Sequence, residues 1–173
     1  MPVRGRVTAH TPTLARELPL LWLRRTGVAG EATVLKCIVL LAEDFDDTRE
    51  VFAFYLREAG FAVHDLPDGD HVLPQAIELQ PDVIVLDLGL PGMDGYALMA
   101  ALRAHPLTAH MPVVILSAHA YPEDERRARE AGASAFVRKP CLPADLATAL
   151  KSVSESCGRA FSAESGGQPA AAV

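Results

Sequence analysis

The chain has 173 residues, half of them hydrophobic, which predicts a domain of ordinary size with a core of its own. Its formal net charge of −6 argues against duplex DNA as a direct partner, because DNA binding rests on cationic side chains that neutralise phosphates. Three cysteines without a CxxC pair argue against a disulfide framework or a zinc site. No apolar run approaches the ~20 residues that cross a bilayer. We therefore expect a cytoplasmic protein without membrane contact.

The first 35 residues lack a sustained hydrophobic period. Prolines interrupt them at positions 2, 12 and 19, and five arginines against two glutamates give them a local positive charge. We expect residues 1–35 to be a poorly ordered N-terminal extension. Two origins stay open: a genuine flexible extension, or a stretch that lies partly upstream of the true start of the protein.

The regular pattern begins with residues 36–42 (KCIVLLA), a continuous apolar run that is typical of a strand covered on both faces. Residues 46–59 then carry apolar side chains three and four positions apart, which predicts a helix that Gly60 ends. The pattern Asp47-x-x-Glu50 favours a capping box at the start of this helix.

The same alternation of strands and helices continues along the chain. Further strands are predicted at 61–65, 82–87, 111–117 and 134–139, and further helices at 72–79, after a capping Asp94, at 122–131 and at 143–154. Five strands alternating with five helices predict an α/β domain over residues 36–155, with a parallel sheet, helices on both faces and right-handed crossovers. Residues 156–173 are small, polar and aperiodic, and we expect a disordered C-terminal tail.

Chemically informative side chains close the predicted strands. Glu43 and Asp44 follow the first strand, and Asp87 closes the third. Ser117 closes the fourth strand, and Lys139 closes the fifth. Because ligands of open parallel sheets bind beyond the carboxyl ends of the strands, we expect these side chains to share one rim.

Three carboxylates on one rim repel each other and raise one another's pKa values unless a cation neutralises them. Oxygen ligands that leave room for water and phosphate suit Mg²⁺. The lysine adds a fixed positive charge, and the serine hydroxyl can donate to an incoming anion. Together these groups predict a site for phosphoryl transfer, where positioning and charge neutralisation supply most of the catalysis.

Each of these residues taken alone also has a structural interpretation. An acid pair after a strand is often a helix cap, and a serine at such a place is often a turn residue. Lys139 before Pro140 is equally consistent with a solvated strand end. The functional interpretation depends on the joint occurrence, because all five positions fall at the same end of the predicted strands.

Four segments resemble the receiver family of two-component response regulators. They are LLAEDFDDTRE, PDVIVLDLGLPGMDG, PVVILSA and AGASAFVRKP, in the order and with the spacing of the family. The string DLGLPGMDG is specific, and the resemblance covers about residues 36–155. It implies a flavodoxin-like, doubly wound five-stranded parallel sheet with the strand order 2-1-3-4-5 and five helices.

The resemblance also implies a role for each matched acid. Asp87 resembles the aspartate that accepts the phosphoryl group, and Asp44 resembles the direct metal ligand, with Glu43 alongside it. The backbone carbonyl of Gly89 would complete the protein's share of the Mg²⁺ ligands.

Three further residues match the groups that respond to phosphorylation in this family. Lys139 would pair with the phosphoryl oxygens, and the Lys139–Pro140 peptide is typically cis in the family. Ser117 resembles the hydroxyl that turns toward the phosphate. Phe136 occupies the aromatic switch position, and with the helix at 122–131 it is the expected docking surface for the output.

The implied function is a signalling domain, not an enzyme with a separate substrate: it would catalyse only its own phosphorylation and slow autodephosphorylation. A sensor histidine kinase or a histidine phosphotransfer protein would phosphorylate Asp87 in the presence of Mg²⁺. Too few residues follow the last predicted helix for an output module. We therefore expect output through a downstream protein target, with a homodimer also possible and with no direct DNA binding.

Two other functions stay open. A phosphatase that turns over a phospho-aspartate is one, but its common signature has a second aspartate where this chain has Gly89. A pseudo-receiver that binds its partners constitutively is the other, and the full set of acids, hydroxyl and lysine argues against it.

Overall fold

The structure, a computed structural model, describes residues 36–118 and 121–156. The predicted N-terminal extension over 1–35 lies outside the described residues. So does the predicted C-terminal tail, apart from Ser156, which is the last residue of a helix.

Within the described residues, five strands alternate with five helices. The strands are β1 (Ile38–Ala42), β2 (Ala62–Leu66), β3 (Val83–Asp87), β4 (Val113–Ser117) and β5 (Ala135–Arg138). The helices are α2 (Asp46–Glu58), α3 (Val72–Leu79), α4 (Gly95–Ala104), α5 (Pro122–Glu130) and α6 (Pro143–Ser156). In the part of the chain that the structure covers, no helix is long and apolar enough to span a bilayer.

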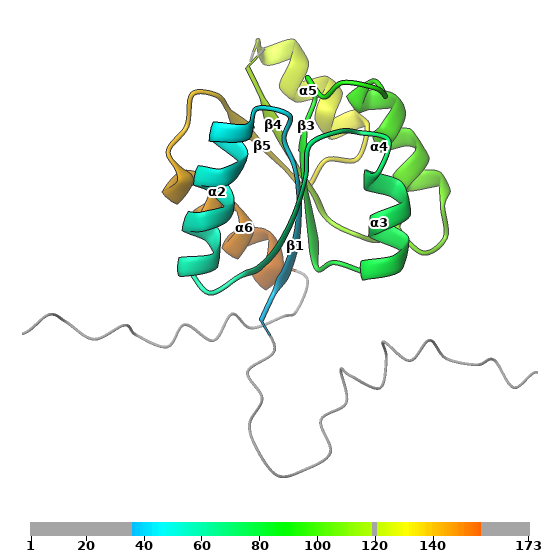
Figure 1. The fold of residues 1–173 in the computed structure, drawn as a ribbon. Coiled ribbons are helices and arrows are strands. Elements are labelled where there is room, and N and C mark those ends of the chain that lie inside the picture. Colours follow the sequence, from blue (N-terminus) through cyan, green and yellow to red (C-terminus); the bar gives the residue numbers. More distant parts are fainter. Residues whose placement is uncertain (1–35, 119–120, 157–173) are drawn as a thin grey trace, which may run out of the picture. The chain divides into compact units, whose positions relative to one another are not determined.

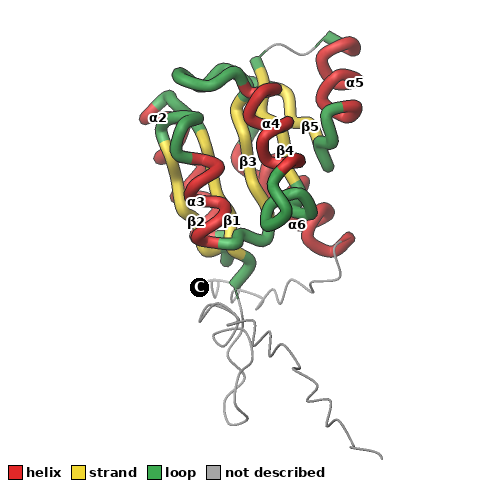
Figure 2. Tube along the Cα trace, turned by 90° about the vertical axis from the view of Figure 1, so that its right-hand side faces the viewer, coloured by secondary structure: helices red, strands yellow, loops and turns green. Residues whose placement is uncertain are grey.

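The strands form one parallel sheet with the order β2-β1-β3-β4-β5. This order confirms the predicted doubly wound, flavodoxin-like fold class. Figure 1 shows α2 and α6 on one side of the sheet and α3 and α4 on the other. Figure 2, seen from the side of α3 and α4, shows α4 lying across the central strands.

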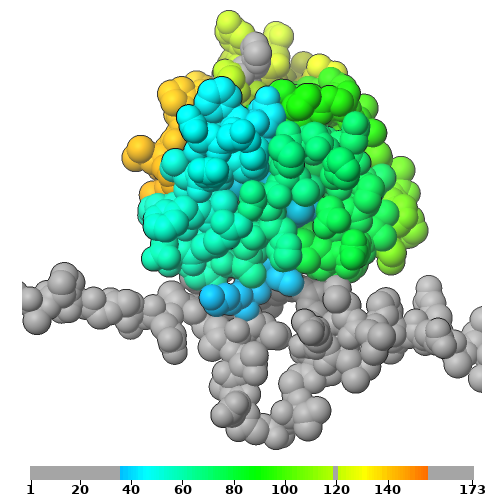
Figure 3. All heavy atoms as spheres, in the orientation of Figure 1, coloured from blue at the N-terminus to red at the C-terminus, as the bar shows by residue number. Residues whose placement is uncertain are grey.

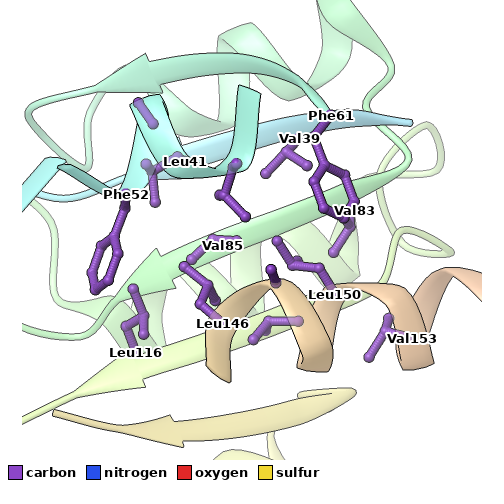
Figure 4. Packing of buried hydrophobic residues seen from close by; sticks show 14 residues of the cluster. Val39, Leu41, Phe52, Phe61, Val83, Val85, Leu116, Leu146, Leu150 and Val153 are labelled. Carbon is purple, nitrogen blue, oxygen red and sulfur yellow. The ribbon is translucent and has the colours of Figure 1, made fainter. Parts of the chain in front are cut away.

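The two faces of the sheet bury separate apolar clusters, because successive side chains of a strand point to opposite sides. All residues of β3 and β4 are buried, as expected of central strands covered by helices on both faces. Val39 and Leu41 of β1 belong to the cluster under α2 and α6, whereas Leu40 belongs to the cluster under α3, α4 and α5. Figure 4 shows part of the first cluster, with Leu146 and Leu150 of α6 above the strands.

Two helix ends agree with the sequence pattern and one does not. The Asp94 side chain accepts hydrogen bonds from the backbone N–H groups of Tyr96 and Ala97, which confirms the predicted cap of α4. Gly60 follows the end of α2 with a φ of 97°, a left-handed conformation that favours glycine.

The predicted cap of α2 is wrong. The helix begins at Asp46, its N-cap residue is Phe45, and no side chain caps it. Asp47 therefore lies inside the first turn, where its negative charge is favourable near the positive end of the helix dipole. The Asp47-x-x-Glu50 spacing has the pattern of a capping box, but it does not determine the residue at which the helix starts.

Replacing Leu150 by alanine should lower the free energy of unfolding by about 2–5 kcal/mol, because the side chain is fully buried and its removal leaves a cavity under α6. Urea unfolding followed by circular dichroism measures this loss. Leu142→Ala is the matched control, since Leu142 is 67% exposed and its truncation should change stability by less than about 0.5 kcal/mol. Equal losses in the two variants would contradict the assignment of this core.

Candidate functional site

The register of the parallel strands brings their carboxyl ends to one edge of the sheet. Ala42 pairs with Leu86, so Glu43 follows β1 beside Asp87, the last residue of β3. On the other side, Asp87 pairs with Leu116, which places Ser117 one position further along β4. The predicted rim therefore exists in the fold.

Three carboxylates gather at this edge. Glu43, Asp44 and Asp87 each offer an oxygen, and these oxygens all lie within 4.8 Å of one another. Glu43 and Asp87 are buried, with 1% and 7% of their surface exposed, whereas Asp44 is exposed. The burial of two acids makes their mutual repulsion stronger than it would be in water.

Lys139 supplies the positive charge of the cluster. Its Nζ donates to Glu43 Oε2 at 2.5 Å and also to Asp87 Oδ2. The backbone N–H of Lys139 donates to the carbonyl of Ser117 at 2.8 Å, which fixes the residue beside the end of β4. The Lys139–Pro140 peptide is cis, as the resemblance implied.

The ionisation of these groups follows from burial and pairing. Burial raises the pKa of the Glu43 carboxyl above its usual value, and the hydrogen bond from Lys139 only partly offsets this. For Lys139, burial acts to lower the pKa, but the hydrogen bonds to Asp87 and Glu43 outweigh it and hold the pKa above its usual value. Lys139 is therefore a permanent ammonium at neutral pH. Its single positive charge does not balance the negative charges of the three clustered acids.

The donor set fits a magnesium ion. Three carboxylates against one ammonium leave a net negative charge, and carboxylate oxygens are the ligands that Mg²⁺ prefers. The exposed Asp44 leaves one side of the cluster open to solvent, which suits an ion that keeps several waters.

Gly89 contacts the central acid through its backbone. Its N–H donates to Asp87 Oδ1 at 2.8 Å, so one oxygen of that carboxylate is held by the amide and the other by Lys139. A Cβ at Gly89 would come within 3.4 Å of Asp87 Oδ1, an ordinary van der Waals contact. The predicted role of the Gly89 carbonyl as a metal ligand stays a prediction.

The two predicted switch residues lie on the same face of the sheet. Phe136 pairs with Ile115, and Ser117 follows Ile115 by two positions, so strand alternation directs both toward the face that carries α3, α4 and α5. Ser117 is buried, and Phe136 is half-buried against the apolar cluster of that face. Their response to phosphorylation stays a prediction.

The second strand ends differently from the sequence-based prediction. It runs from Ala62 to Leu66, one residue beyond the predicted end, so Asp65 lies within the strand. Its carboxylate pairs instead with Arg57, at 2.6 Å, and with Arg49, at 3.6 Å.

Sequence reasoning gave no role to Arg49. Its guanidinium donates to the backbone carbonyls of Glu43 and Asp44, the two residues that supply acids to the cluster. In the sequence, Arg49 looks like an ordinary partner of Asp46 three residues before it on a helix surface. No spacing rule could have revealed contacts with the preceding loop.

Comparison with known proteins identifies the family of this sequence. A family model described as the response regulator receiver domain matches residues 39–151. Among curated proteins, the phosphate regulon transcriptional regulatory protein PhoB of Escherichia coli is 36% identical over 115 residues, a match that covers 66% of this chain and 50% of PhoB. The chain thus spans about half the length of this relative.

Two solved structures match this chain over nearly their whole length, unlike PhoB. The chemotaxis response regulator CheY4 of Vibrio cholerae is 28% identical, with a TM-score of 0.65 and coverage of 69% of this chain and 99% of that chain. The signal receiver domain of a signal transduction histidine kinase from Syntrophus aciditrophicus is 31% identical, with a TM-score of 0.64 and coverage of 73% and 96%.

In the absence of metal, the contribution of Glu43 to stability should decrease as the pH rises. The folded state keeps the Glu43 proton to a higher pH than the unfolded chain, so the contribution is fully present below the usual value of 4.5 and is lost as the pH passes the raised pKa. Glu43→Gln cannot ionise, and it should therefore gain stability relative to the wild type between about pH 4 and about pH 7.

Urea unfolding of both proteins in EDTA across this range measures the trend. Glu50→Gln, which changes an exposed carboxylate on α2, is the control. A stability difference between Glu43→Gln and the wild type that does not vary with pH would show that burial of Glu43 has been misjudged.

Proposed function

The chain belongs to the family of response regulator receiver domains, and from this premise we propose that Asp87 is the residue that accepts a phosphoryl group. Receiver domains are signalling domains of two-component systems, which act together with histidine kinases. The observation that carries the proposal is the position of the Asp87 carboxylate, which is bonded to the Lys139 ammonium and lies beside the acids Glu43 and Asp44 at the open edge of the sheet.

The proposed reaction is a direct transfer. A carboxylate oxygen of Asp87 attacks the phosphorus of a phosphohistidine, a new O–P bond forms, and the P–N bond breaks as the imidazole leaves. The product is an acyl phosphate on Asp87. The Gly89 N–H, which donates to Asp87 Oδ1, holds the carboxylate in a fixed orientation before the attack.

Lys139 has a second proposed task after the transfer. Its ammonium already neutralises Asp87, and the new phosphoryl oxygens offer it a stronger partner within the same pocket. Glu43, Asp44 and Asp87, together with the Gly89 carbonyl, would hold the Mg²⁺ ion. When bound, the ion neutralises charge that builds up on the transferring phosphoryl oxygens.

The output is proposed to follow from Ser117 and Phe136. A phosphoryl group on Asp87 offers the Ser117 hydroxyl an acceptor, and Phe136 lies on the same face of the neighbouring strand. Movement there would alter α5, which the guanidinium of Arg127 ties to the Tyr96 ring of α4 at 3.8 Å. A downstream protein that reads the α5 face is the proposed target.

A phosphoryl donor must also reach Asp87, and exposed apolar side chains lie on the loop after β1, on α2 and on the loop after β5. Phe45 follows Asp44 directly and is 64% exposed, and Phe54 on α2 is 67% exposed. Leu142 is 67% exposed in the loop between β5 and α6, and Figure 1 shows this loop beside α2. The space-filling view in Figure 3 shows this loop next to the surface of α2. We expect a histidine-containing helical protein to dock there.

Incubation with acetyl phosphate and Mg²⁺ should add one phosphoryl group, a gain of about 80 Da in intact mass. Asp87→Asn should abolish the gain because it removes the accepting carboxylate. Asp47→Asn, which changes an exposed acid on α2, should leave it intact. A stable adduct in Asp87→Asn would refute the assignment of the acceptor, and absence of any adduct in the wild type would favour a pseudo-receiver. Continuous release of phosphate from a small ester, lost in Asp87→Asn, would favour a phosphatase.

Phe54→Ser should slow transfer from the cognate histidine kinase by about tenfold, since burying an aromatic side chain at an interface commonly contributes this much. The kinase is found by profiling purified, autophosphorylated kinases of the source organism against the full chain. Leu107→Ser is the control, because Leu107 is also exposed but lies in the loop after α4. Phosphorylation by acetyl phosphate should be equal in all three proteins. A kinase rate that Phe54→Ser leaves unchanged argues against docking on α2.

A further inference from the structure

Arg49, near the start of α2, is bonded to the loop that carries two of the three clustered acids. Its Nη1 donates to the backbone carbonyl of Glu43 at 3.0 Å and, less closely, to that of Asp44 at 3.4 Å. Its Nη2 donates to the carboxylate of Asp46, and its Nε lies 3.6 Å from Asp65 Oδ2. Only 14% of the Arg49 side chain is exposed, and its bond to the Glu43 carbonyl is partly buried.

Other hydrogen bonds also restrain the loop between β1 and α2, among them one from the backbone N–H of Phe45 to the Glu43 carboxylate. Phe45, the N-cap residue of α2, makes no side-chain cap. The Glu43 N–H donates to the carbonyl of Leu66, which holds the loop on its β2 side. Because a peptide unit is planar, fixing a carbonyl also fixes the plane of the two adjoining Cα atoms, and this limits where their side chains begin. The bonds from Arg49 thus restrict where the carboxylates of Glu43 and Asp44 can lie.

We propose that Arg49 is a positioning residue of the metal site: by holding the carbonyls of Glu43 and Asp44, it keeps their carboxylates in the arrangement that binds Mg²⁺. The inference rests on the proposed function of this site. Without a cation the clustered carboxylates repel one another, and a loop that is free to move would relieve the repulsion by separating them. Arg49 opposes this separation from the backbone side of the loop.

The charge of Arg49 is not the main contribution. The carboxylates of Asp46 and Asp65 already pair with the guanidinium, which reduces its field at the acidic cluster. What distinguishes an arginine here is the planar fork of N–H donors, which reaches two carbonyls and two carboxylates at once. A lysine has a single ammonium and cannot reproduce this pattern.

Arg57 provides a matched comparison within the same helix. Its Nη2 donates to Asp65 Oδ1 at 2.6 Å and to the carbonyl of Val63 at 3.1 Å. Arg57 therefore shares the Asp65 partner with Arg49, but its bonds go to β2 and not to the loop of Glu43 and Asp44. A variant of Arg57 disturbs the ion pair with Asp65 while leaving the carbonyl bonds of Arg49 in place.

The test measures the binding of Mg²⁺ alone to the full chain. A titration with MgCl₂, monitored by ¹H–¹⁵N NMR, gives the Kd. Arg49→Met should raise the Kd about tenfold, the lower end of what loss of a residue supporting metal ligands causes. Arg49→Lys should raise it about threefold, and Arg57→Met should stay within about twofold of the wild type. At saturating Mg²⁺, the rate of phosphorylation by acetyl phosphate should be the same in all four proteins.

Several results would overturn the positioning role of Arg49. One is a Kd for Mg²⁺ in Arg49→Met that equals the wild-type value. Another is an equal rise of this Kd in Arg49→Met and Arg57→Met, because it would place the effect in the ion pairs of Asp65. A wild-type Kd in Arg49→Lys would show a charge effect and would also overturn the role. This variant decides the question if Arg49→Met does not fold. Absence of Mg²⁺ binding in the wild type instead overturns the proposed function.

Discussion

The structure depends on one electrostatic constraint: two buried acids and one exposed acid share an edge of the sheet with a single internal ammonium. Lys139 bonds both Glu43 and Asp87, and this leaves uncompensated negative charge in a partly dehydrated site. Burying acids in such a site is unfavourable without a cation, and burial raises the pKa of the Glu43 carboxyl. The site is also ready for a divalent cation and for a phosphoryl group that the cation can neutralise.

The apolar core makes this constraint tolerable. Helices cover both faces of the sheet, and the strands are locked in register by side chains that alternate between two clusters. A slip of β1 by one residue would exchange Leu40 with Leu41 between the two faces and would carry Glu43 away from Asp87. In the described part of the chain, every buried side-chain nitrogen or oxygen has a hydrogen-bond partner. Packing and hydrogen bonding of the buried groups therefore keep the clustered carboxylates together despite their mutual repulsion.

The proposed phosphorylation of Asp87 would act on bonds that the site already contains. Asp87 is held by the Gly89 amide on one oxygen and by Lys139 on the other, so a new group on this carboxylate changes the partners of both. Ser117 and Phe136 lie on adjacent strands of one face, within the reach of such a change. Under the proposed function, the helices of that face would carry the output.

The sequence by itself determined the fold class and the candidate acids, because both follow from local patterns. Apolar runs such as that of β3 identify buried strands, and parallel strands must present their last residues at one edge. It misplaced the cap of α2, because the N-cap residue of this helix is Phe45, which has no polar side chain and so leaves no capping signal in the sequence. Only the tertiary structure decided that Lys139 bridges Glu43 and Asp87, that Asp65 turns away to two arginines, and that Arg49 holds the loop of the acids. These contacts join residues whose spacing in the chain carries no periodic signal, and they exist only once the strands are in register.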